Sequence, residues 1–379
     1  MIVGCVTEIK KHEYRVGMTP DNVKSYVAQG HEVLIQAGAG NGSAFLDEEY
    51  ITAGAKMVEN AKEIWDKSQM IIKVKEPLTE EYQHFHEDLI LYTYLHLAAD
   101  ESLTKAMLKS KVKGVAYETL VEKNGGIPLL KPMSEIAGRL SVQEGAKYLE
   151  KPFGGRGVLL GGVPGVKKAN VVIVGAGVVG TNACKMAVGL GAQVTIMDNN
   201  LDRLAYLDDI FGQQIQTLYS TDAAIENALK DADLIIGSVL IPGKKAPKLI
   251  KERYLKQMLP GSVIVDVAVD QGGCCETTKV TYHDDPTYVV DGVVHYCVGN
   301  MPGSVPRTAT IALTNATLRY GLPIANQGLE NACAQNPALY SAINTYKGAM
   351  TCENVAVGFQ MEYVPITELM TTAGAMVTA

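Results

Sequence analysis

The sequence has no apolar run long enough to cross a membrane. A spanning helix needs roughly 18 or more consecutive apolar residues, and no apolar run among the 379 residues is that long. The first residues, MIVGCVTEIKKHEYRV, also lack the basic start and apolar stretch of a secretory signal. We therefore expect a cytoplasmic protein without a membrane partner.

A disulfide-forming cysteine pattern and a strong net charge are missing as well. Seven cysteines, an odd number without C-x-x-C spacing, argue against a disulfide framework and suit a reducing compartment. The adjacent Cys274 and Cys275 leave a redox role open, but the pattern favours small buried thiols. The formal net charge of −7, without a basic stripe, argues against a nucleic-acid partner.

The composition that is present, 47% hydrophobic and 20% charged residues, is typical of a globular protein, and the length suits two domains. Before residue 130, short apolar runs alternate with amphipathic runs, which is typical of a parallel sheet whose strands are joined by helices. Strands are predicted at 2–6, 32–37, 70–75, 89–95 and 114–118, and helices at 21–30, 60–67 and 101–110.

A second α/β pattern follows. The stretch 134–151 predicts a long helix with Ser134 as its N-cap, and the glycine-rich loop 151–162 leads into six further strands. Six strands are the complement of a full dinucleotide-binding domain. They are predicted at 171–175, 193–198, 214–219, 233–239, 262–268 and 287–294.

From residue 307 the pattern turns helical, first over RTATIALTNATLRYGL and then in shorter pieces. A chain that leaves one domain and returns to it late gives a split domain. We therefore predict an α/β fold with two doubly wound domains. A Rossmann-type NAD-binding domain, 131–306, is inserted into a discontinuous substrate domain made of 1–130 and 307–379.

Residues 171–180, VVIVGAGVVG, join a β-branched strand to three glycines with the spacing G-x-G-x-x-G, and a helical run follows. In this context Gly175 permits a tight turn, Gly177 lets the backbone approach a pyrophosphate, and Gly180 lets helix and strand pack closely. The helix N-terminus then offers N–H groups to the phosphates. The alternative is an ordinary turn without a ligand, but the combination favours a dinucleotide site.

Asp198 ends the next predicted strand, and it favours NAD over NADP. Its carboxylate can accept hydrogen bonds from both ribose hydroxyls of NAD, whereas it would repel a 2′-phosphate. Arg203 is the complication, because a nearby arginine can accommodate that phosphate. Because Asp198 ends the strand, its preference for NAD outweighs the effect of Arg203 on a 2′-phosphate. Arg203 is then expected to stack on adenine or to lie in solvent.

The ends of the other strands supply further candidates for cofactor contact, because ligands of such sheets lie outside the carboxyl ends of the strands. Each of these residues is equally well explained as a plain loop residue. They are Ser220, Val239, Leu240, Val267 to Asp270, and Val298, Gly299, Asn300 and Met301.

Three charged or titratable residues follow strands of the first predicted sheet: Arg15, Lys75 and His96. Singly, a lysine or arginine is usually solvated and a histidine usually makes a structural hydrogen bond. Jointly they describe a pocket for a small carboxylate with an acid–base group beside it. Such a pocket, facing a nicotinamide between two domains, suits a dehydrogenase acting on a small amino or keto acid.

Six segments, in order and over nearly the whole chain, resemble the bacterial L-alanine dehydrogenase family. The wider family includes the NAD(H)-binding subunit of proton-translocating transhydrogenase and saccharopine-forming lysine dehydrogenases. The resemblance implies the reaction L-alanine + NAD⁺ + H₂O ⇌ pyruvate + NADH + NH₄⁺. The segments are EIKKHEYRVGMTP (8–20), KVKEP (73–77), TYLHLA (93–98), GAGVVG (175–180), VDQGG (269–273) and NMPGSVPRT (300–308).

The resemblance also implies residue roles. Arg15 and Lys75 would bind pyruvate, His96 would be the acid–base residue, Asp270 would also be catalytic, and Asn300 would lie by the nicotinamide. Members usually assemble as hexamers, so a homohexamer is expected. Positions that contact the cofactor in the family are matched at Ser134, Val178, Val179, Asp198, Ser220, Arg203 and Lys279. At Arg203 and Lys279, this sequence has the other basic residue than some members have.

Three alternatives remain open at this point. A transhydrogenase subunit would need membrane partners, and an NAD-sensing protein would bind the nucleotide without turnover. Glycine or serine could serve as side substrates. Some family members carry a glutamate and a histidine as a magnesium site, but GLPIANQGLENA (321–332) has no histidine, so no metal is expected.

Overall fold

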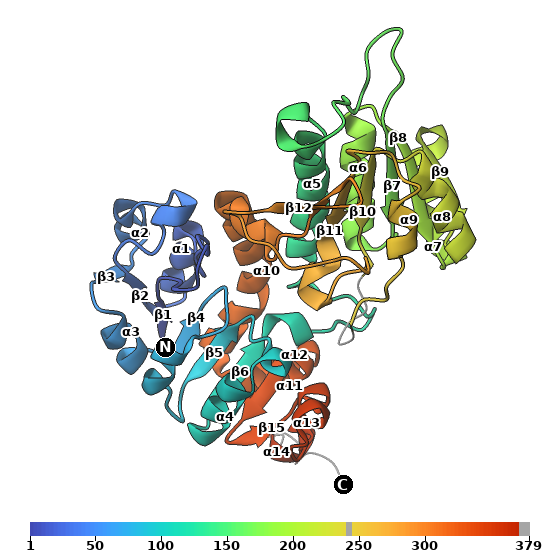
Figure 1. Cartoon of the computed structure of the whole chain (residues 1–379). Coiled ribbons are helices and arrows are strands. Elements are labelled where there is room, and N and C mark those ends of the chain that lie inside the picture. Colours follow the sequence, from blue (N-terminus) through green and yellow to red (C-terminus); the bar gives the residue numbers. More distant parts are fainter. Residues whose placement is uncertain (240–244, 371–379) are drawn as a thin grey trace. The chain divides into compact units, whose positions relative to one another are not determined.

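The computed structural model describes residues 1–239 and 245–370 (Figure 1). The chain forms two compact units. Unit 1 consists of Met1–Met133 and the chain from Val305 onward, and unit 2 is Ser134–Ser304.

Unit 1 is built on a sheet of eight strands with the order β15-β14-β6-β5-β4-β1-β2-β3. All pairs from β6 to β3 are parallel, whereas β14 and β15 are added antiparallel at the edge. The strands are β1 (Ile2–Cys5), β2 (Glu32–Gln36), β3 (Lys56–Val58), β4 (Met70–Ile72), β5 (Ile90–Thr93), β6 (Lys113–Ala116), β14 (Ile343–Tyr346) and β15 (Ala349–Met350).

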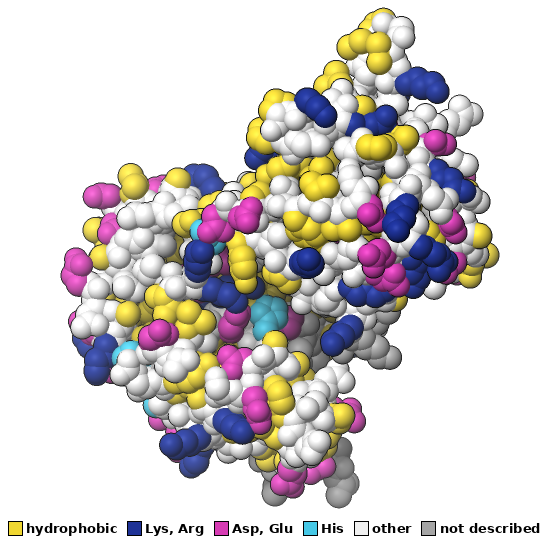
Figure 2. All heavy atoms as spheres, in the orientation of Figure 1, with side chains coloured by type: hydrophobic (Ala, Val, Ile, Leu, Met, Phe, Trp, Pro, Cys, Tyr) yellow, Lys and Arg dark blue, Asp and Glu magenta, His cyan; other side chains and the backbone are white. Residues whose placement is uncertain are grey.

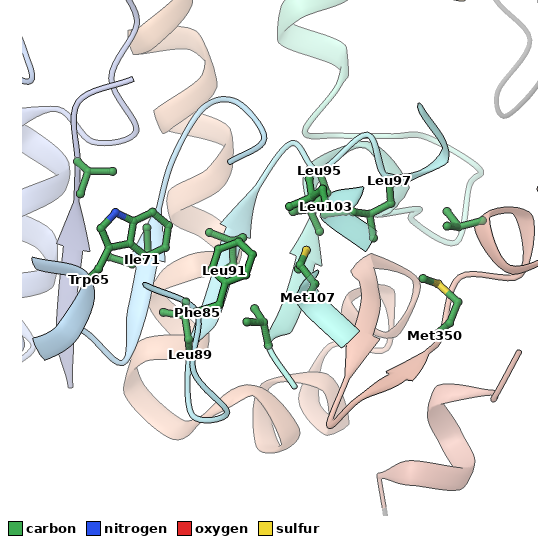
Figure 3. Packing of buried hydrophobic residues seen from close by; sticks show 14 of the residues in the cluster. Trp65, Ile71, Phe85, Leu89, Leu91, Leu95, Leu97, Leu103, Met107 and Met350 are labelled. Atoms are coloured by element: carbon green, nitrogen blue, oxygen red, sulfur yellow. The ribbon is translucent and has the colours of Figure 1, made fainter. Parts of the chain in front are cut away.

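Nine α-helices of the described residues belong to unit 1, and the apolar side chains of several of them pack on this sheet. Figure 3 shows one such layer, in which Trp65, Leu91 and Met107 come from a helix, a strand and a second helix. The helices are α1 (Pro20–Ala28), α2 (Asp47–Thr52), α3 (Ala61–Lys67), α4 (Glu101–Lys109), α10 (Pro306–Gln327), α11 (Leu329–Gln335), α12 (Ala338–Ala342), α13 (Glu353–Phe359) and α14 (Ile366–Leu369).

Unit 2 contains a sheet of seven strands with the order β12-β13-β11-β10-β7-β8-β9. All pairs are parallel except β12 with β13. Without β12, this is the strand order of a full dinucleotide-binding domain. The strands are β7 (Asn170–Val174), β8 (Gln193–Asp198), β9 (Ile215–Tyr219), β10 (Leu234–Gly237), β11 (Val263–Asp266), β12 (Thr287–Val290) and β13 (Val293–Tyr296).

In the described part of unit 2, the sheet is accompanied by the α-helices α5 (Lys131–Tyr148), α6 (Val178–Gly189), α7 (Leu201–Phe211), α8 (Asp222–Lys230) and α9 (Glu252–Leu255). Short 3-10 helices join the elements of both units. They are η1 (Asn41–Ser43), η2 (Thr79–His84), η3 (Leu97–Ala99), η4 (Tyr117–Thr119), η5 (Lys151–Phe153), η6 (Gly212–Gln214), η7 (Val267–Gln271) and η8 (Met301–Ser304).

The predicted fold class is confirmed, but several elements were predicted wrongly. The stretch 287–294 is not one strand: Asp291 and Gly292 have φ of 48° and 80° and turn the chain into the β12–β13 hairpin. Ser134 is not an N-cap, because α5 begins at Lys131. The sequence also missed β3, β14 and β15, and α10 continues through Pro323, where a stop was expected.

In the ranges 1–239 and 245–370, no helix combines the length and the apolar character that crossing a membrane requires. On the face drawn in Figure 2, Lys and Arg side chains are interspersed with Asp and Glu side chains.

Candidate active site

The three predicted residues of unit 1 follow three neighbouring strands, β1, β4 and β5. Parallel strands end at the same edge of a sheet, so the segments after them meet there. Arg15 interacts electrostatically with Tyr94, whose ring stacks on that of His96, with centroids 5.8 Å apart and planes at 8°. Lys75 in turn influences the charge of His96. Arg15 and His96 thus both lie near Tyr94, and Lys75 lies near His96.

The backbone of His96 is fixed in an uncommon conformation. Its φ of 48° and ψ of 35° lie in the left-handed region, where non-glycine residues are rare and often mark functional sites. The carboxylate of Glu118 holds it there by accepting hydrogen bonds from the amides of His96 (2.6 Å) and Leu95 (3.2 Å). The same carboxylate lies 4.0 Å from the imidazole Nδ1, and the His96 side chain is 40% exposed. The ring is therefore both oriented and accessible.

The surroundings of His96 favour its neutral form. Although the ring is partly exposed, the protein atoms packed around it displace much of its hydration, and this lowers the pKa of the imidazole below its ordinary value of 6.5. Lys75 lowers the pKa further, and Glu118 and Glu76 oppose the shift only in part. A neutral imidazole near neutral pH can accept a proton, and the adjacent carboxylate can stabilise the imidazolium that results.

Arg15 is almost fully buried, with 3% of its surface exposed. Its Nε and one terminal nitrogen donate to the two carboxylate oxygens of Glu13 at 2.6 Å and 2.5 Å, and the other terminal nitrogen lies 3.1 Å from the sulfur of Met133. The sequence did not predict Glu13. Its carboxylate pairs with the guanidinium through two hydrogen bonds and thereby fixes the plane of that group.

Lys75 and Glu76 lie in the loop after β4, and both are partly buried. Burial alone would raise the pKa of Glu76, but Lys75, His96 and Lys10 outweigh it and hold the pKa below its ordinary value. Glu76 also forms an ion pair with Lys10. Charges of both signs therefore surround His96, and neither Lys10 nor Glu76 was predicted from the sequence.

In unit 2, the three motif glycines have the geometry that a phosphate-binding turn requires. Gly175 has a φ of 103°, and a Cβ at Gly180 would lie 1.8 Å from the carbonyl oxygen of Gly175. Among the residues that the structure describes, apart from its chain neighbours, none has an atom within 4 Å of a Cβ at Gly177, so this residue faces open space there. Gly177 is also the N-cap of α6 and provides no side-chain cap. The first amides of α6, from Val178 and Val179, can therefore bind an anion there.

Asp198 and Arg203 both hold this turn from the end of β8 and the start of α7. One Asp198 oxygen accepts from the amide of Ala176 at 2.7 Å, and the other accepts from the amide of Asn200 at 2.9 Å. The guanidinium of Arg203 donates to the carbonyl of Ala176 (2.7 Å) and to the hydroxyl of Thr181 (2.6 Å). The expectation that Arg203 is simply solvated is therefore wrong, because its side chain braces the glycine turn.

Asp270, Gly299 and Asn300 meet in unit 2. The Asp270 carboxylate accepts from the amide of Asn300 at 3.2 Å, and its other oxygen would lie 3.0 Å from a Cβ at Gly299. Asn300 has a φ of 55°, again in the left-handed region. Asp266, fully buried and missed from the sequence, caps η7 by accepting from the amide of Ala268 at 3.1 Å. The start of η7, the short helix that carries Asp270, is thus fixed.

The remaining predicted cofactor residues are more scattered. The Ser220 amide donates to the Asp198 carbonyl at 3.0 Å, and the Val239 side chain lies beside Gly175. Lys279 lies over the ring of Tyr288, and Ser134 lies within α5 one turn before Gly138, which packs against Val179. Leu240 lies outside the described residues. Val267 begins η7, Val298 pairs with Thr281, and Met301 begins η8.

Comparison with known proteins covers both units. The family model described as alanine dehydrogenase/PNT, N-terminal domain, matches residues 4–137, and that of the C-terminal domain matches residues 141–353. Alanine dehydrogenase from Methanococcus maripaludis is 57% identical over 96% of this chain and 98% of its own length.

Two solved structures extend the comparison. An L-alanine dehydrogenase is 53% identical, with a TM-score of 0.93 over 95% of this chain and 99% of the other. A transhydrogenase from Sinorhizobium meliloti is only 23% identical, with a TM-score of 0.79 over 93% of this chain and 99% of the other, and it shows the fold alone. The resemblance seen in the six sequence segments is confirmed, and the chain belongs to the alanine dehydrogenase/PNT family.

Proposed function

We propose that this chain is an L-alanine dehydrogenase that catalyses the reversible, NAD-dependent oxidative deamination of L-alanine to pyruvate and ammonium. The observation that carries the proposal is the cluster of Arg15, Lys75 and His96 at one edge of the unit 1 sheet. A protein that only binds a nucleotide has no use for two cations beside an accessible, neutral imidazole.

The fold of unit 2 and the family imply a nicotinamide cofactor, and the residues present fit NAD. The open space before Gly177 and the uncapped N-terminus of α6 suit a pyrophosphate. Asp198 lies at the end of β8, where a carboxylate suits two free ribose hydroxyls and repels a 2′-phosphate. NAD, when bound, accepts the hydride that alanine loses from its Cα. We assign unit 2 to the cofactor and unit 1 to the substrate.

The substrate groups of unit 1 follow from their chemistry. The guanidinium of Arg15, oriented by Glu13, binds the substrate carboxylate. Lys75 stabilises the negative charge that develops on the ketone oxygen of pyruvate in the reductive direction. His96, neutral before the reaction, accepts a proton in the oxidative direction, and the imidazolium, stabilised by Glu118, returns it in the reductive one.

Asp270 and Asn300 are the proposed contribution of unit 2 to the chemistry. The Asp270 carboxylate, held against the amide of Asn300, binds the water that adds to the iminium intermediate or the ammonium that leaves. Asn300 orients Asp270 and lies next to the nicotinamide.

We further propose that the protein works in the cytoplasm as a homohexamer, as the family resemblance implies. Sedimentation equilibrium tests the assembly, and a particle of six 40.7 kDa chains is the expected result. A monomer or dimer at micromolar concentration would contradict it.

The activity is tested with the purified full-length chain, NAD⁺ and a panel of small amino acids, by following NADH absorbance. L-alanine is expected to be the best substrate, with glycine and serine weaker and NADP⁺ poor. Reduction of NAD⁺ by alanine without any membrane partner argues against a transhydrogenase subunit. Tight NADH binding without turnover on any amino acid would instead support a nucleotide sensor.

A further inference from the structure

Three ionisable side chains are buried together beneath the loop that carries Lys75. The ammonium of Lys73 lies 2.9 Å from a Glu81 oxygen and 3.2 Å from a Glu8 oxygen. The side chains of Lys73, Glu8 and Glu81 are only 1%, 2% and 8% exposed. We call these three residues the buried triad.

Burial of these charges is costly, which calls for a physical reason for their presence. Removing charges from water often costs as much as their mutual attraction returns, so apolar side chains of similar size would stabilise the fold about as well. Burial alone would lower the pKa of Lys73, but Glu8 and Glu81 outweigh it and hold the pKa above its ordinary value, so the lysine stays charged. The buried triad is therefore better explained by the geometry that it imposes than by stability.

The two carboxylates hold the backbone on either side of Lys75. The second oxygen of Glu8 accepts from the amide of Val74 at 2.6 Å, and the second oxygen of Glu81 accepts from the amide of Leu78 at 2.9 Å. Lys73 joins the two carboxylates. Each end of the short segment 74–78 is thus fixed by one arm of the same ion-paired unit.

The carbonyl groups of the segment are fixed as well. The Lys73 carbonyl accepts from the hydroxyl of Tyr117 at 3.1 Å, and the Lys75 carbonyl accepts from the hydroxyl of Thr93 at 3.1 Å. The Val74 carbonyl accepts from the amide of Tyr94 at 3.3 Å. The backbone that carries Lys75 is therefore tied to β5, to η4 and to the buried triad.

We propose that Glu8, Lys73 and Glu81 act as positioning residues that place the ammonium of Lys75 for the substrate. This inference rests on the proposed role of Lys75. Lys73 is almost fully buried and paired with two carboxylates, so it positions the loop and does not bind the substrate. Lys75 is the lysine that binds the substrate.

The test is a double-mutant cycle in the full-length chain, with kcat/KM for pyruvate measured at saturating NADH and ammonium. Since a misplacement of about 1 Å can cost roughly 10²-fold in rate, Lys73→Met should lose at least about tenfold. The dissociation constant of NADH should stay unchanged. In a Lys75→Met background, Lys73→Met should cost little more, because the positioned group is already gone.

Two further variants make the result decisive. Glu81→Gln keeps an oxygen for the Leu78 amide and keeps the Lys73–Glu8 pair, so it provides the test if Lys73→Met does not fold. We expect it to lower kcat/KM for pyruvate less than Lys73→Met does, and to cause no further loss in the Lys75→Met background. Lys56→Met is the matched control, because its ion pair with Glu32 in the same unit is exposed. It should leave kcat/KM unchanged.

The inference would be overturned, and the proposed role of Lys75 left intact, if Lys73→Met and Glu81→Gln each kept the kcat/KM for pyruvate of the unmutated protein. The same follows if their losses in kcat/KM multiply with the loss caused by Lys75→Met. Lys75→Met with normal kinetics would overturn the proposed role of Lys75 and the inference with it.

Discussion

At the scale of single residues, the chemistry of His96 depends on the charges around it. Burial and Lys75 lower the pKa of the imidazole, whereas Glu118 raises it. Glu118 also accepts a hydrogen bond from the amide of His96, so one side chain both fixes the backbone of His96 and raises the pKa of its ring. A catalytic acid–base group works best when its pKa lies near the operating pH, and this balance of neighbours determines it.

Glu118→Gln should therefore shift the acidic limb of the pH profile. Glutamine keeps an oxygen for the amides of Leu95 and His96 but removes the charge that stabilises the imidazolium. The pKa of His96 falls further, so the pH at which kcat/KM for alanine is half-maximal on the acidic side should move to lower pH. A limb that stays in place, or moves to higher pH, would show that Glu118 does not influence the essential group.

The choice of nicotinamide is tested at Asp198. Asp198→Asn removes the charge but retains an oxygen for the Ala176 amide, so the turn should survive. Relief of the repulsion should narrow the preference for NAD over NADP by at least tenfold, which corresponds to about 1.4 kcal/mol. The ratio of the two kcat/KM values measures this. An unchanged ratio, or comparable use of both cofactors by the unmutated protein, would contradict the assigned role.

At the scale of elements, a substitution in the turn between β7 and α6 can change nucleotide binding without changing the stability of the fold. A Cβ at Gly177 would meet no atom of the other described residues within 4 Å, so Gly177→Ala should fold normally while its methyl group fills the space assigned to the pyrophosphate. We expect thermal unfolding near that of the unmutated protein and NADH affinity lower by tenfold or more, about 1.4 kcal/mol.

Gly189→Ala, at the other end of α6, is the control for this prediction. It also meets open space, and alanine is favoured over glycine in a helix by roughly 0.5–1 kcal/mol. NADH titration by fluorescence should therefore separate the two variants. Equal affinity of Gly177→Ala and Gly189→Ala would place the pyrophosphate elsewhere.

The elements themselves were predictable where local pattern decides them. The strand at 193–198 coincides with β8, because its apolar run ends in Asp198 and asparagines. The β12–β13 hairpin was missed although Asp291-Gly292 between two apolar runs is a strong turn signal. By contrast, β14 pairs with β6, more than 200 residues earlier in the chain, and its sequence alone carries no sign of that partner.

At the scale of the whole molecule, the sequence predicted the residues that follow strand ends but not the residues that hold them. The strand-end rule nominated Arg15, Lys75 and His96, and the topology places the strands before them side by side, so that they follow one edge of the sheet. Glu13 and Glu118 were missed, since nothing local to a glutamate shows which guanidinium or amide its carboxylate meets in the fold. Partner choice is a tertiary property, and only the structure shows it.

In the proposed mechanism, unit 1 supplies acid–base chemistry that is separate from nucleotide binding in unit 2. His96→Gln tests this most directly, because glutamine removes the titratable group and His96 lies in unit 1. We expect an unchanged dissociation constant for NADH and a loss of turnover with alanine of about 10²-fold or more at neutral pH. A His96→Gln protein that oxidises alanine at near-normal rates would contradict it.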